Sequence, residues 1–291
     1  MRRVARQLAL LGLGGLRRLI PLAARRSMVV WLARHGSVPY RDRLVFELVR
    51  DYAQRDPSGC HRFLWAHHLA YAASYSVEQR FGAEHINETR HLLFADLRRV
   101  LIERGIEPET DVRSVFEVGA SLGYLLRHLE TGLFRSATLE GIDIDRQAIE
   151  QGSAHLSAMG SKVQLRVADT LQLETVLGSR KADVFLCAGV LLYLADADAR
   201  ELVRSILGHT SMLAAFAGLA HPVQDNASLA SSAVRERDAT RIHNIDAMVR
   251  EAGGDVVWRR WEGPRVVDGN TIYFVFASPE SRSRPSASRA P

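Results

Sequence analysis

The stretch SVFEVGASLGYLLRHL, from Ser114 to Leu129, decides the fold. Its first residues predict a short buried strand, in which Glu117 is flanked by apolar Val115, Phe116 and Val118. Glycines then mark a tight turn, and leucines recur along one side of a helix that begins near Tyr124. Strand, glycine turn and helix open a nucleotide-type βαβ unit, whose ligand lies beyond the carboxyl ends of the strands. We therefore expect this turn to face a ligand.

The charge beside the turn bears on the kind of ligand. A dinucleotide fingerprint, G-x-G-x-x-G, places bare backbone and a helix N-terminus against an anionic pyrophosphate. Here the spacing is G-x-x-x-G, from Gly119 to Gly123 with Ser121 between them, and Glu117 precedes the first glycine by two residues. A carboxylate would repel phosphate but suits S-adenosylmethionine, which carries a sulfonium and an ammonium group. A glycine turn after an apolar strand is also ordinary βα geometry, so the downstream sequence must decide.

Composition predicts a globular chain with an uneven charge. The 291 residues are 47% hydrophobic and 24% charged, enough for one large domain or two modest ones. The first 50 residues contain eleven arginines and two acidic residues, Asp42 and Glu47, and so have a net charge of +9. Because the whole chain has a net charge of +5, the remainder has a net charge of −4 and is mildly acidic. This distribution argues against a nucleic-acid-binding face across the molecule. Cys60 and Cys187 form no disulfide framework or C-x-x-C metal site, which predicts a reducing, cytoplasmic location.

Residues 1–36 form a basic arm in this interpretation. Arginines interrupt its apolar blocks, the longest of which is about nine residues, whereas a bilayer span needs about 20. Arg17 and Arg18 also break the outline of a secretory signal, and no small-residue cleavage site follows. Two interpretations stay open: an amphipathic helix that makes peripheral contact with an anionic membrane, or an arm that packs on the body or on a partner chain.

Residues 37–108 are predicted to be a helical cap over the carboxyl edge of the sheet. Apolar stripes recur at helical spacing at Leu44, Val45, Leu48, Val49 and Tyr52, and again at Leu93, Leu97, Val100 and Leu101, before a stop at Gly105. His61, His67 and His68 lie between them without carboxylates at matching spacing, so we interpret them as surface or packed histidines and predict no metal site. Tyr71 or Tyr75 could close over a ligand.

The remaining chain predicts an α/β fold with a doubly wound, mostly parallel sheet. Strand-like segments SATLEGIDID, KVQLRVADT, DVFLCAG and TSMLAAFAGLAHP alternate with helices over residues 146–159 and 197–207. Asn244 is expected to cap a helix over residues 245–252, and DVVWRRW and NTIYFVFAS, joined by GPRVVDG, predict a closing antiparallel hairpin. Residues 279–291 are rich in Pro, Ser and Arg and predict a disordered tail.

Taken together, residues 109–278 resemble the class I S-adenosylmethionine-dependent methyltransferases. The resemblance rests on the order and spacing of the elements and implies a seven-stranded Rossmann-like sheet with a closing hairpin. It places Glu117, Gly119 and Gly123 in the first-strand motif, where the turn passes under the methionine portion of the cofactor. It also implies that Asp143, followed by Ile144, holds the ribose hydroxyls, because a carboxylate accepts two hydrogen bonds from a vicinal diol.

The resemblance assigns further cofactor contacts downstream. Asp169, with Ala168 and Thr170 alongside, would accept a hydrogen bond from the adenine amino group, although Asp-Thr after a strand is also an ordinary turn. Cys187 and Ala188 on the fourth strand would line the site, with Cys187 as a small apolar residue. We interpret Asp145 as a helix cap.

Two departures from the family pattern are visible. Gly208 stands alone where the family usually has a Gly-Gly turn before the fifth strand. The fourth strand lacks the Asn/Asp-Pro-Pro-aromatic tetrapeptide of enzymes that methylate bases or glutamine side chains. The second departure argues against a DNA or glutamine methyltransferase.

Methyl transfer from a sulfonium is an in-line displacement that mainly needs alignment in a site with little water. A base matters only for a hydroxyl, thiol or protonated amine acceptor. His221, after the fifth strand, and Tyr193, after the fourth, are the candidates, with His243 and Arg241 as a third choice. Against His221, the sequence His-Pro also predicts a turn.

The sequence thus predicts an S-adenosylmethionine-dependent methyltransferase that acts on a small molecule through an oxygen, nitrogen or carbon nucleophile. Two alternatives stay open. One is an NAD-dependent oxidoreductase, which would tolerate Glu117 poorly. The other is a non-catalytic S-adenosylmethionine-binding protein that regulates a partner.

Overall fold

The computed structural model describes residues 19–34, 45, 48–49, 52–82, 86–235 and 238–279. The predicted tail beyond residue 279, the first 18 residues of the arm and much of the predicted helical stripe near residue 47 lie outside this part of the chain. The chain divides into two compact units, Met1–Ser74 and Tyr75–Pro291. Each unit has its own apolar core.

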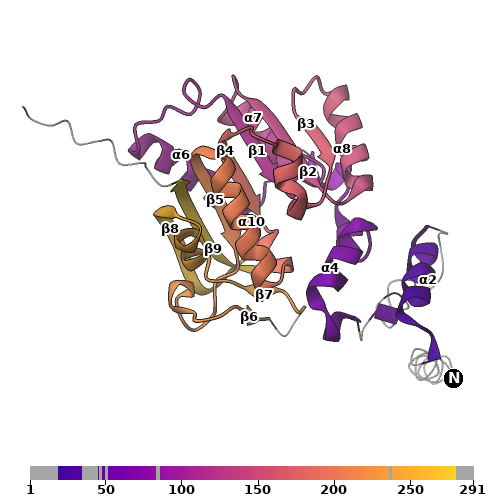
Figure 1. Cartoon of the computed structure of the whole chain (residues 1–291). Helices are drawn as coiled ribbons and strands as arrows, with labels where there is room; N and C mark the ends of the chain where they lie inside the picture. The colour runs from indigo at the N-terminus through magenta and orange to yellow at the C-terminus, as the bar shows by residue number, and fades with distance from the viewer. Residues whose placement is uncertain are drawn as a thin grey trace, which may run out of the picture. The chain divides into compact units, whose positions relative to one another are not determined.

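The N-terminal unit is helical. It contains α2 (Leu22–Arg34), α4 (Pro57–Ala66) and a short 3-10 helix, η1 (Ala72–Ser74) (Figure 1). Asp56 begins α4, because its side chain accepts a 2.8 Å hydrogen bond from the amide of Gly59 and Pro57 occupies the first turn. The core of this unit includes Val29, Val45, Leu48, Val49, Cys60, Phe63, Leu64 and Leu69.

The three histidines singled out by the sequence are packed or at the surface: His61 is buried, His68 is partly buried and His67 is exposed. His61 Nδ1 lies 2.5 Å from the Tyr71 hydroxyl, and the His67 ring lies 4.9 Å from that of Phe63. Across the described residues, no group of three or more His, Cys, Asp or Glu side chains is placed to hold a metal ion. Nor does any described helix have the length and apolar character that crossing a bilayer requires.

The C-terminal unit is built on a seven-stranded sheet with the order β3-β2-β1-β4-β5-β9-β8 (Figure 1). Strands β1 to β5 are parallel, and β9 and β8 complete the sheet as an antiparallel pair. The bounds are β1 Ser114–Val118, β2 Thr138–Asp143, β3 Gln164–Val167, β4 Ala182–Ala188, β5 Thr210–Gly218, β8 Gly254–Val267 and β9 Asn270–Pro279. The predicted doubly wound sheet with a closing hairpin is confirmed.

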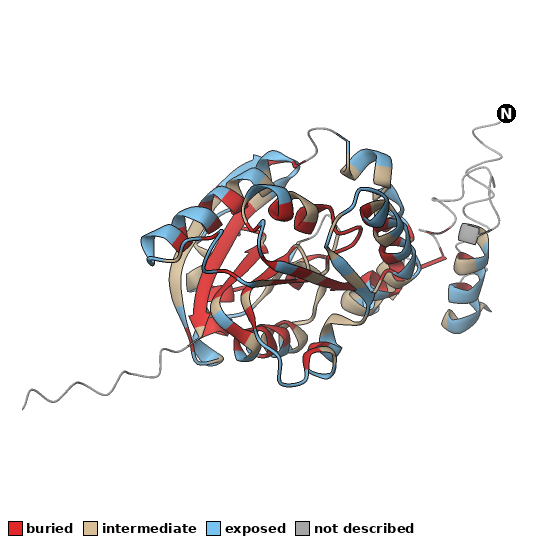
Figure 2. Ribbon diagram, turned by 90° about the horizontal axis from the view of Figure 1, so that it is seen from above, coloured by how far each residue is buried: buried red, intermediate tan, exposed pale blue. Residues whose placement is uncertain are grey.

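Helices cover both faces of this sheet because its strands alternate apolar side chains between two cores. One core joins Val115 of β1 to α6 (Glu88–Glu103), α7 (Tyr124–Gly132) and α8 (Arg146–Ala158). The other joins Phe116 and Val118 to α9 (Leu173–Leu177), α10 (Asp196–His209) and α11 (Ile245–Glu251). The buried strands therefore run between two layers of helices that are exposed on their outer sides (Figure 2).

Several predicted helix ends are confirmed. Asp145 and Asn244 accept hydrogen bonds of 3.0 Å and 2.9 Å from the amides of Ala148 and Ala247, and so cap α8 and α11. Gly105, with φ +72°, lies just beyond the end of α6. The leucine stripe of α6, assigned to the cap by sequence, packs on the face of the sheet.

The closing hairpin differs from its prediction. Strand β8 continues through most of the predicted loop at residues 263–269, with an irregular register between Trp261 and Val266. The turn is the two-residue Asp268-Gly269, whose φ angles of 51° and 79° are those of a type I′ hairpin turn. A small second hairpin, β6 (Ala233–Val234) and β7 (Arg241–Ile242), was also not predicted.

The hairpin holds α6 in place. Asp268 accepts hydrogen bonds from the amide and the hydroxyl of Thr89, at 2.8 Å and 2.9 Å, in the first turn of α6. Farther along the helix, buried Asp96 accepts two hydrogen bonds from the guanidinium of Arg260 on β8, at 2.6 Å and 2.9 Å. The position of α6, and of the residues at its beginning, therefore depends on the last two strands.

Candidate functional site

The order of the strands places the switch point of the sheet at the carboxyl ends of β1 and β4. From β1 the chain proceeds outward to β2 and β3, and it then returns to the other side of β1 with β4 and β5. A ligand site is expected at this switch point. The glycine turn that follows β1 lies at this edge, as the sequence predicts.

The turn requires its glycines. Gly119 and Gly123 have φ angles of +80° and +74°, and a Cβ at Gly119 would lie 2.2 Å from Val190 Cγ2. Ser121, at the centre of the turn, is also left-handed, with φ +49°. The turn is therefore a backbone arrangement held tightly against its neighbours.

Asp143 secures the turn from the end of β2. Its two carboxylate oxygens accept 2.8 Å hydrogen bonds from the amides of Ser121 and Asp145. Burial raises the pKa of Asp143 to about 6 despite these hydrogen bonds. Each oxygen has a further lone pair, so the carboxylate can also accept from a diol at the carboxyl edge of the sheet.

Glu117 is the most deeply buried carboxylate of the site, with 1% of its surface exposed. Burial raises its pKa to about 8, Arg90 lowers it and Asp143 raises it further. Within the described residues, Glu117 Oε2 and Ser121 Oγ are buried and have no hydrogen-bond partner. Because buried polar atoms are normally paired, two such atoms at one turn fit a polar ligand with hydrogen-bond donors.

Arg90 is a candidate site residue that the sequence analysis missed. It lies in the first turn of α6, and its Nη2 donates a 3.3 Å hydrogen bond to the carbonyl of Ala188, the last residue of β4. A carboxylate and a guanidinium thus lie together at the switch point. This pair matches the ammonium and carboxylate groups of an α-amino acid, such as the methionine end of S-adenosylmethionine.

An aromatic pair adjoins the glycine turn. The guanidinium of Arg80, at the end of α5 (Val77–Arg80), lies 3.9 Å from the ring centroid of Tyr75 and 5.6 Å from that of Tyr124. Burial raises the pKa of Tyr124, the first residue of α7. Tyr75 is therefore the predicted tyrosine that the structure places beside the turn, whereas Tyr71 belongs to the N-terminal unit and contacts His61.

The other predicted cofactor residues follow neighbouring strands. Asp169 comes two residues after β3 and is partly exposed. Its side chain accepts a 3.0 Å hydrogen bond from the amide of Leu171, so Asp169 caps the 3-10 helix η2 (Thr170–Gln172). The amide of Ala168 donates to the carbonyl of Asp143 at 3.0 Å. Cys187 is buried at the end of β4, and burial raises the pKa of its thiol, so it is not poised as a nucleophile.

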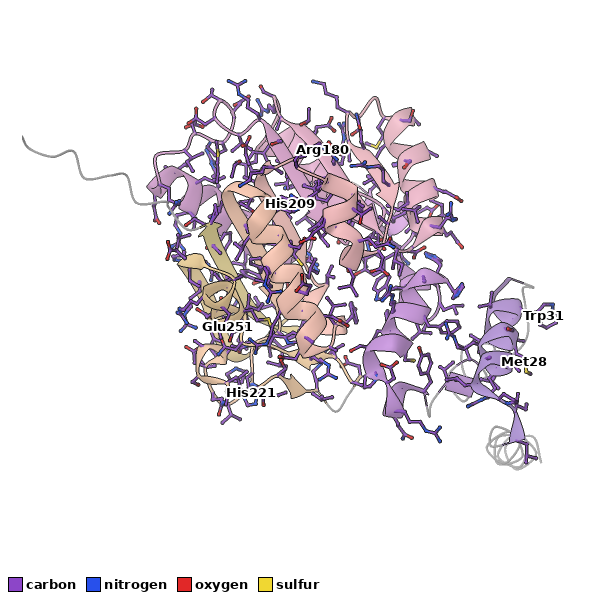
Figure 3. All side chains as sticks on the ribbon, viewed as in Figure 1. Met28, Trp31, Arg180, His209, His221 and Glu251 are labelled. Carbon is purple, nitrogen blue, oxygen red and sulfur yellow. The ribbon has the colours of Figure 1, made fainter. Side chains whose placement is uncertain are left out.

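The predicted catalytic candidates differ in what surrounds them. His221 follows β5, at the end of the sheet opposite Arg180 and His209 (Figure 3). Its Nδ1 accepts hydrogen bonds from the amides of Val223 and Gln224, at 3.3 Å and 3.2 Å, which is the turn that the His-Pro sequence also predicts. A neutral ring in this arrangement carries its proton on Nε2.

Tyr193 and His243 complete the set of candidates. Tyr193 is partly buried in the 3-10 helix η3 (Leu191–Tyr193) that follows β4. His243 is 3% exposed, and both of its ring nitrogens are engaged, with Ser232 Oγ at 2.7 Å and the carbonyl of Leu191 at 2.9 Å. Its contacts hold η3 to the loop before α11 and leave no nitrogen for a substrate.

Residues 115–211 match the family model of a methyltransferase domain. This stretch is similar to a methyltransferase domain, in agreement with the predicted resemblance to the class I S-adenosylmethionine-dependent methyltransferases. The match begins on β1, spans the glycine turn and Asp143, and ends in β5, so it covers the strands on both sides of the switch point. S-adenosylmethionine is accordingly the cofactor, and neither the NAD-dependent nor the non-catalytic alternative is supported.

Solved structures share the fold of this methyltransferase. An S-adenosylmethionine-dependent methyltransferase from Clostridium acetobutylicum aligns with a TM-score of 0.50 and 10% identity, over 72% of this chain and 98% of that one. Magnesium protoporphyrin IX methyltransferase from Synechocystis, with bound S-adenosylhomocysteine, aligns with a TM-score of 0.50 and 14% identity, over 80% and 99%. The [4+2]-cyclase SpnF gives 0.51 and 13%, over 66% and 82%. No curated protein sequence matches the chain.

Proposed function

We propose that this methyltransferase transfers the methyl group of S-adenosylmethionine to a small molecule whose acceptor atom is oxygen, nitrogen or carbon. The observation that carries the proposal is the pairing of Glu117 and Arg90 at the switch point of the sheet. A buried carboxylate with an unpartnered oxygen suits an ammonium group, and the adjacent guanidinium suits a carboxylate. A dinucleotide would instead bring two phosphates towards a carboxylate.

Each candidate residue at the switch point has a proposed role in holding the cofactor. Glu117 accepts from the ammonium group, Arg90 donates to the carboxylate, and Asp143 accepts from the ribose hydroxyls. Asp169 accepts from the adenine amino group, which is compatible with its present hydrogen bond to Leu171 because a carboxylate has several lone pairs. The remaining proposed lining comprises Gly119, Ser121, Gly123, Ile144, Ala168, Thr170, Cys187 and Ala188.

The bound cofactor supplies an electrophilic methyl group on a sulfonium. The protein then has to hold the acceptor atom in line with that methyl group and exclude water. The burial of Tyr124, directly after the glycine turn, supports the exclusion of water. We propose His221 and Tyr193 as the candidates that act on the acceptor. Because His221 Nδ1 already accepts two hydrogen bonds, a role as a general base is disfavoured. The ring is better suited to donate a hydrogen bond from Nε2–H to the acceptor, or to stabilise the turn.

The small-molecule assignment has support from the end of β4. Ala188 is followed by Gly189, Val190 and Leu191, so the tetrapeptide that binds bases or glutamine side chains in related enzymes is absent from this sequence. The unit Tyr75–Pro291 also has a net charge of −4, which does not favour a nucleic-acid substrate.

Calorimetric titration of the full chain with S-adenosylmethionine, S-adenosylhomocysteine and NAD tests the cofactor assignment. We expect the first two to bind and NAD not to bind, and binding of NAD alone would overturn the assignment. Incubation of cell extracts with methyl-labelled cofactor, followed by mass spectrometry, then tests the substrate class. A labelled product of low molecular mass supports the proposal, whereas label found only in protein or nucleic acid contradicts it.

We also propose a cytoplasmic location, because Cys60 and Cys187 are both free thiols. In addition, we propose that residues 1–36 make peripheral contact with a membrane. The support for membrane contact is an arginine-rich segment in which α2 exposes Met28 and Trp31. Deletion of residues 1–36 should abolish binding to anionic vesicles, and unchanged binding would dismiss the contact.

A further inference from the structure

The division of the chain into two units is also a division of charge. Met1–Ser74 contains 13 arginines and four acidic residues, for a net charge of +9, whereas Tyr75–Pro291 has a net charge of −4. Helix α2 and the sequence before it contain no acidic residue at all. The N-terminal unit is thus a cationic module attached to a mildly acidic methyltransferase domain, and a cationic module of this kind attracts anionic partners.

Helix α2 has apolar side chains on two sides. On the inner side, Val29 is fully buried, and Arg25 donates a 3.0 Å hydrogen bond from Nη1 to the carbonyl of Leu48. On the outer side, Met28 and Trp31 are 43% and 56% exposed, and Leu19, just before the helix, is 82% exposed. Three of the ten exposed large apolar side chains of the described residues therefore lie within this short segment.

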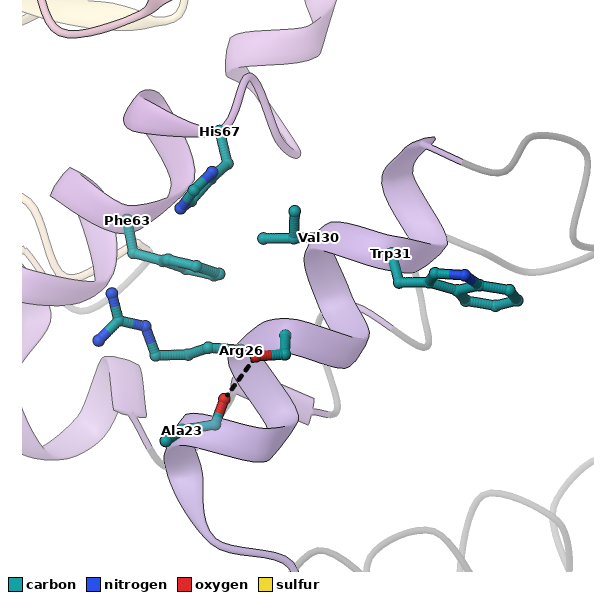
Figure 4. Close-up of a pocket in the computed structure, with 7 residues that line it drawn as sticks. Ala23, Arg26, Val30, Trp31, Phe63 and His67 are labelled. Atoms are coloured by element: carbon teal, nitrogen blue, oxygen red, sulfur yellow. Dashed lines mark hydrogen bonds between the residues drawn. The ribbon is translucent and has the colours of Figure 1, made fainter.

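A pocket that contains one arginine adjoins this exposed face. It is lined by Ala23, Arg26, Ser27, Val30 and Trp31 of α2, by Phe63 of α4 and by His67, which directly follows α4 (Figure 4). The guanidinium of Arg26 lies 4.7 Å from the ring centroid of Phe63 and 5.6 Å from that of Tyr52. The aromatic rings orient an exposed positive charge, while the ring of Trp31 points away from Phe63 and His67 (Figure 4).

These features together fit one kind of partner. Exposed Trp, Met and Leu next to arginines are typical of segments that lie in the interface of a bilayer, with the apolar side chains in the acyl boundary and the cations at the headgroups. Nucleic acid or an acidic protein would match the charge but would leave the apolar face of α2 in water.

We infer that the N-terminal unit binds anionic phospholipid, with Met28 and Trp31 inserted at the interface and Arg26 in contact with the headgroup phosphate. This inference deepens the membrane contact proposed above by naming its residues and its lipid class. It does not depend on methyl transfer. It also assigns the contact to residues of α2, so residues 1–18 are not required for it.

The test is sedimentation of the full chain with vesicles of phosphatidylcholine, alone or mixed with phosphatidylglycerol. We expect binding to the mixed vesicles only, and a decrease of about tenfold in affinity for Met28→Ser/Trp31→Ser. The matched control is Ile102→Ser/Met159→Ser, which removes two equally exposed apolar side chains from the C-terminal unit and should bind normally. Arg26→Gln should weaken binding, and its control Arg146→Gln should not.

Fluorescence provides a second measurement. Brominated lipid in the vesicles should quench tryptophan emission, and Trp31→Phe should lose most of this quenching while Trp258→Phe keeps it. Equal vesicle binding by wild type and Met28→Ser/Trp31→Ser would overturn the inference. If the Met28→Ser/Trp31→Ser variant bound normally but deletion of residues 1–36 abolished binding, the membrane contact would be made by other residues of this segment. Binding of duplex DNA but of no vesicle would also overturn it, and cofactor titration would be unaffected by either result.

Discussion

Arg90 Nη2 lies 3.3 Å from the carbonyl oxygen of Ala188, and this hydrogen bond joins the beginning of α6 to the end of β4. The contact sets a positive charge beside Glu117, whose pKa it lowers against the larger effect of burial. The structure thereby brings together residues that are 98 positions apart in the sequence. The first prediction follows from this pair.

Arg90→Gln should weaken S-adenosylmethionine binding by about 10- to 100-fold, because a charge-assisted hydrogen bond to the methionine carboxylate is lost. The affinity for 5′-methylthioadenosine, which lacks the amino acid portion, should not change. Calorimetry with both ligands measures the difference. Equal losses for the two ligands would mean that Arg90 supports the fold of the site and does not contact the carboxylate.

Glu117 should make cofactor binding depend on pH. Because its pKa in the ligand-free protein is about 8, the carboxyl group is largely neutral at pH 6 and becomes an acceptor for the ammonium group as the pH rises. We expect the affinity for S-adenosylmethionine to increase between pH 6 and pH 8 and Glu117→Gln to flatten this rise. A profile that Glu117→Gln leaves unchanged would contradict the assignment.

The same group affects stability. A carboxyl group with a pKa raised from 4.5 to about 8 by folding stabilises the protein fully below pH 4.5, and this stabilisation is lost as the pH rises through 8. Glu117→Gln should therefore have a higher Tm than wild type at pH 9 by about 3 °C or more, with a smaller difference at pH 5. Thermal unfolding at the two pH values provides the measurement.

Asp143→Asn should destabilise the protein by about 1–3 kcal/mol, because one of its two buried hydrogen bonds to the amides of Ser121 and Asp145 is lost. It should also weaken binding of adenosine compounds. Glu140→Gln, on the same strand, is the control, since its ion pairs with Arg166 and Arg180 are at the surface and contribute little. Equal destabilisation by both variants would argue against the role of Asp143 in the turn.

The role of His221 can be separated from its turn by two substitutions. His221→Ala removes the ring and the acceptor for the amides of Val223 and Gln224, whereas His221→Asn keeps a side-chain acceptor. If the ring acts on the substrate, the rate of methyl transfer should fall by about 100-fold or more in both variants, as expected for loss of a general acid or base. The affinity for the cofactor should stay nearly unchanged. Loss in His221→Ala alone would make His221 a turn residue. Tyr193→Phe tests the second candidate in the same assay.

Local sequence patterns predicted the main elements of the domain. The apolar strand around Glu117, the left-handed glycines and the capping residues Asp145 and Asn244 each act within a few residues, so the sequence reveals them. The long reach of β8 was missed because Gly263 suggested a loop. The Asp268-Gly269 turn, typical of a tight hairpin, marks the true end of the strand.

The site could be predicted only in part. The sequence proposed Glu117 and Asp143 as candidates because each lies on or at the end of a strand with a recognisable pattern, and the structure places both beside the glycine turn. Arg90 was not found, because an arginine in the first turn of a helix carries no local signal and its role depends on a distant carbonyl. For Asp169, the sequence left adenine binding and a turn as alternatives, and its hydrogen bond to Leu171 is compatible with both.

The hydrogen bonds between Asp268 and Thr89 have a consequence for biosynthesis. A nascent chain that has emerged from the ribosome only as far as β5 already contains the glycine turn, Glu117 and Asp143. It still lacks the carboxylate that fixes the beginning of α6, and with it the position of Arg90. Competence to retain the cofactor should therefore arise late in translation, when the final hairpin emerges and pairs with the sheet.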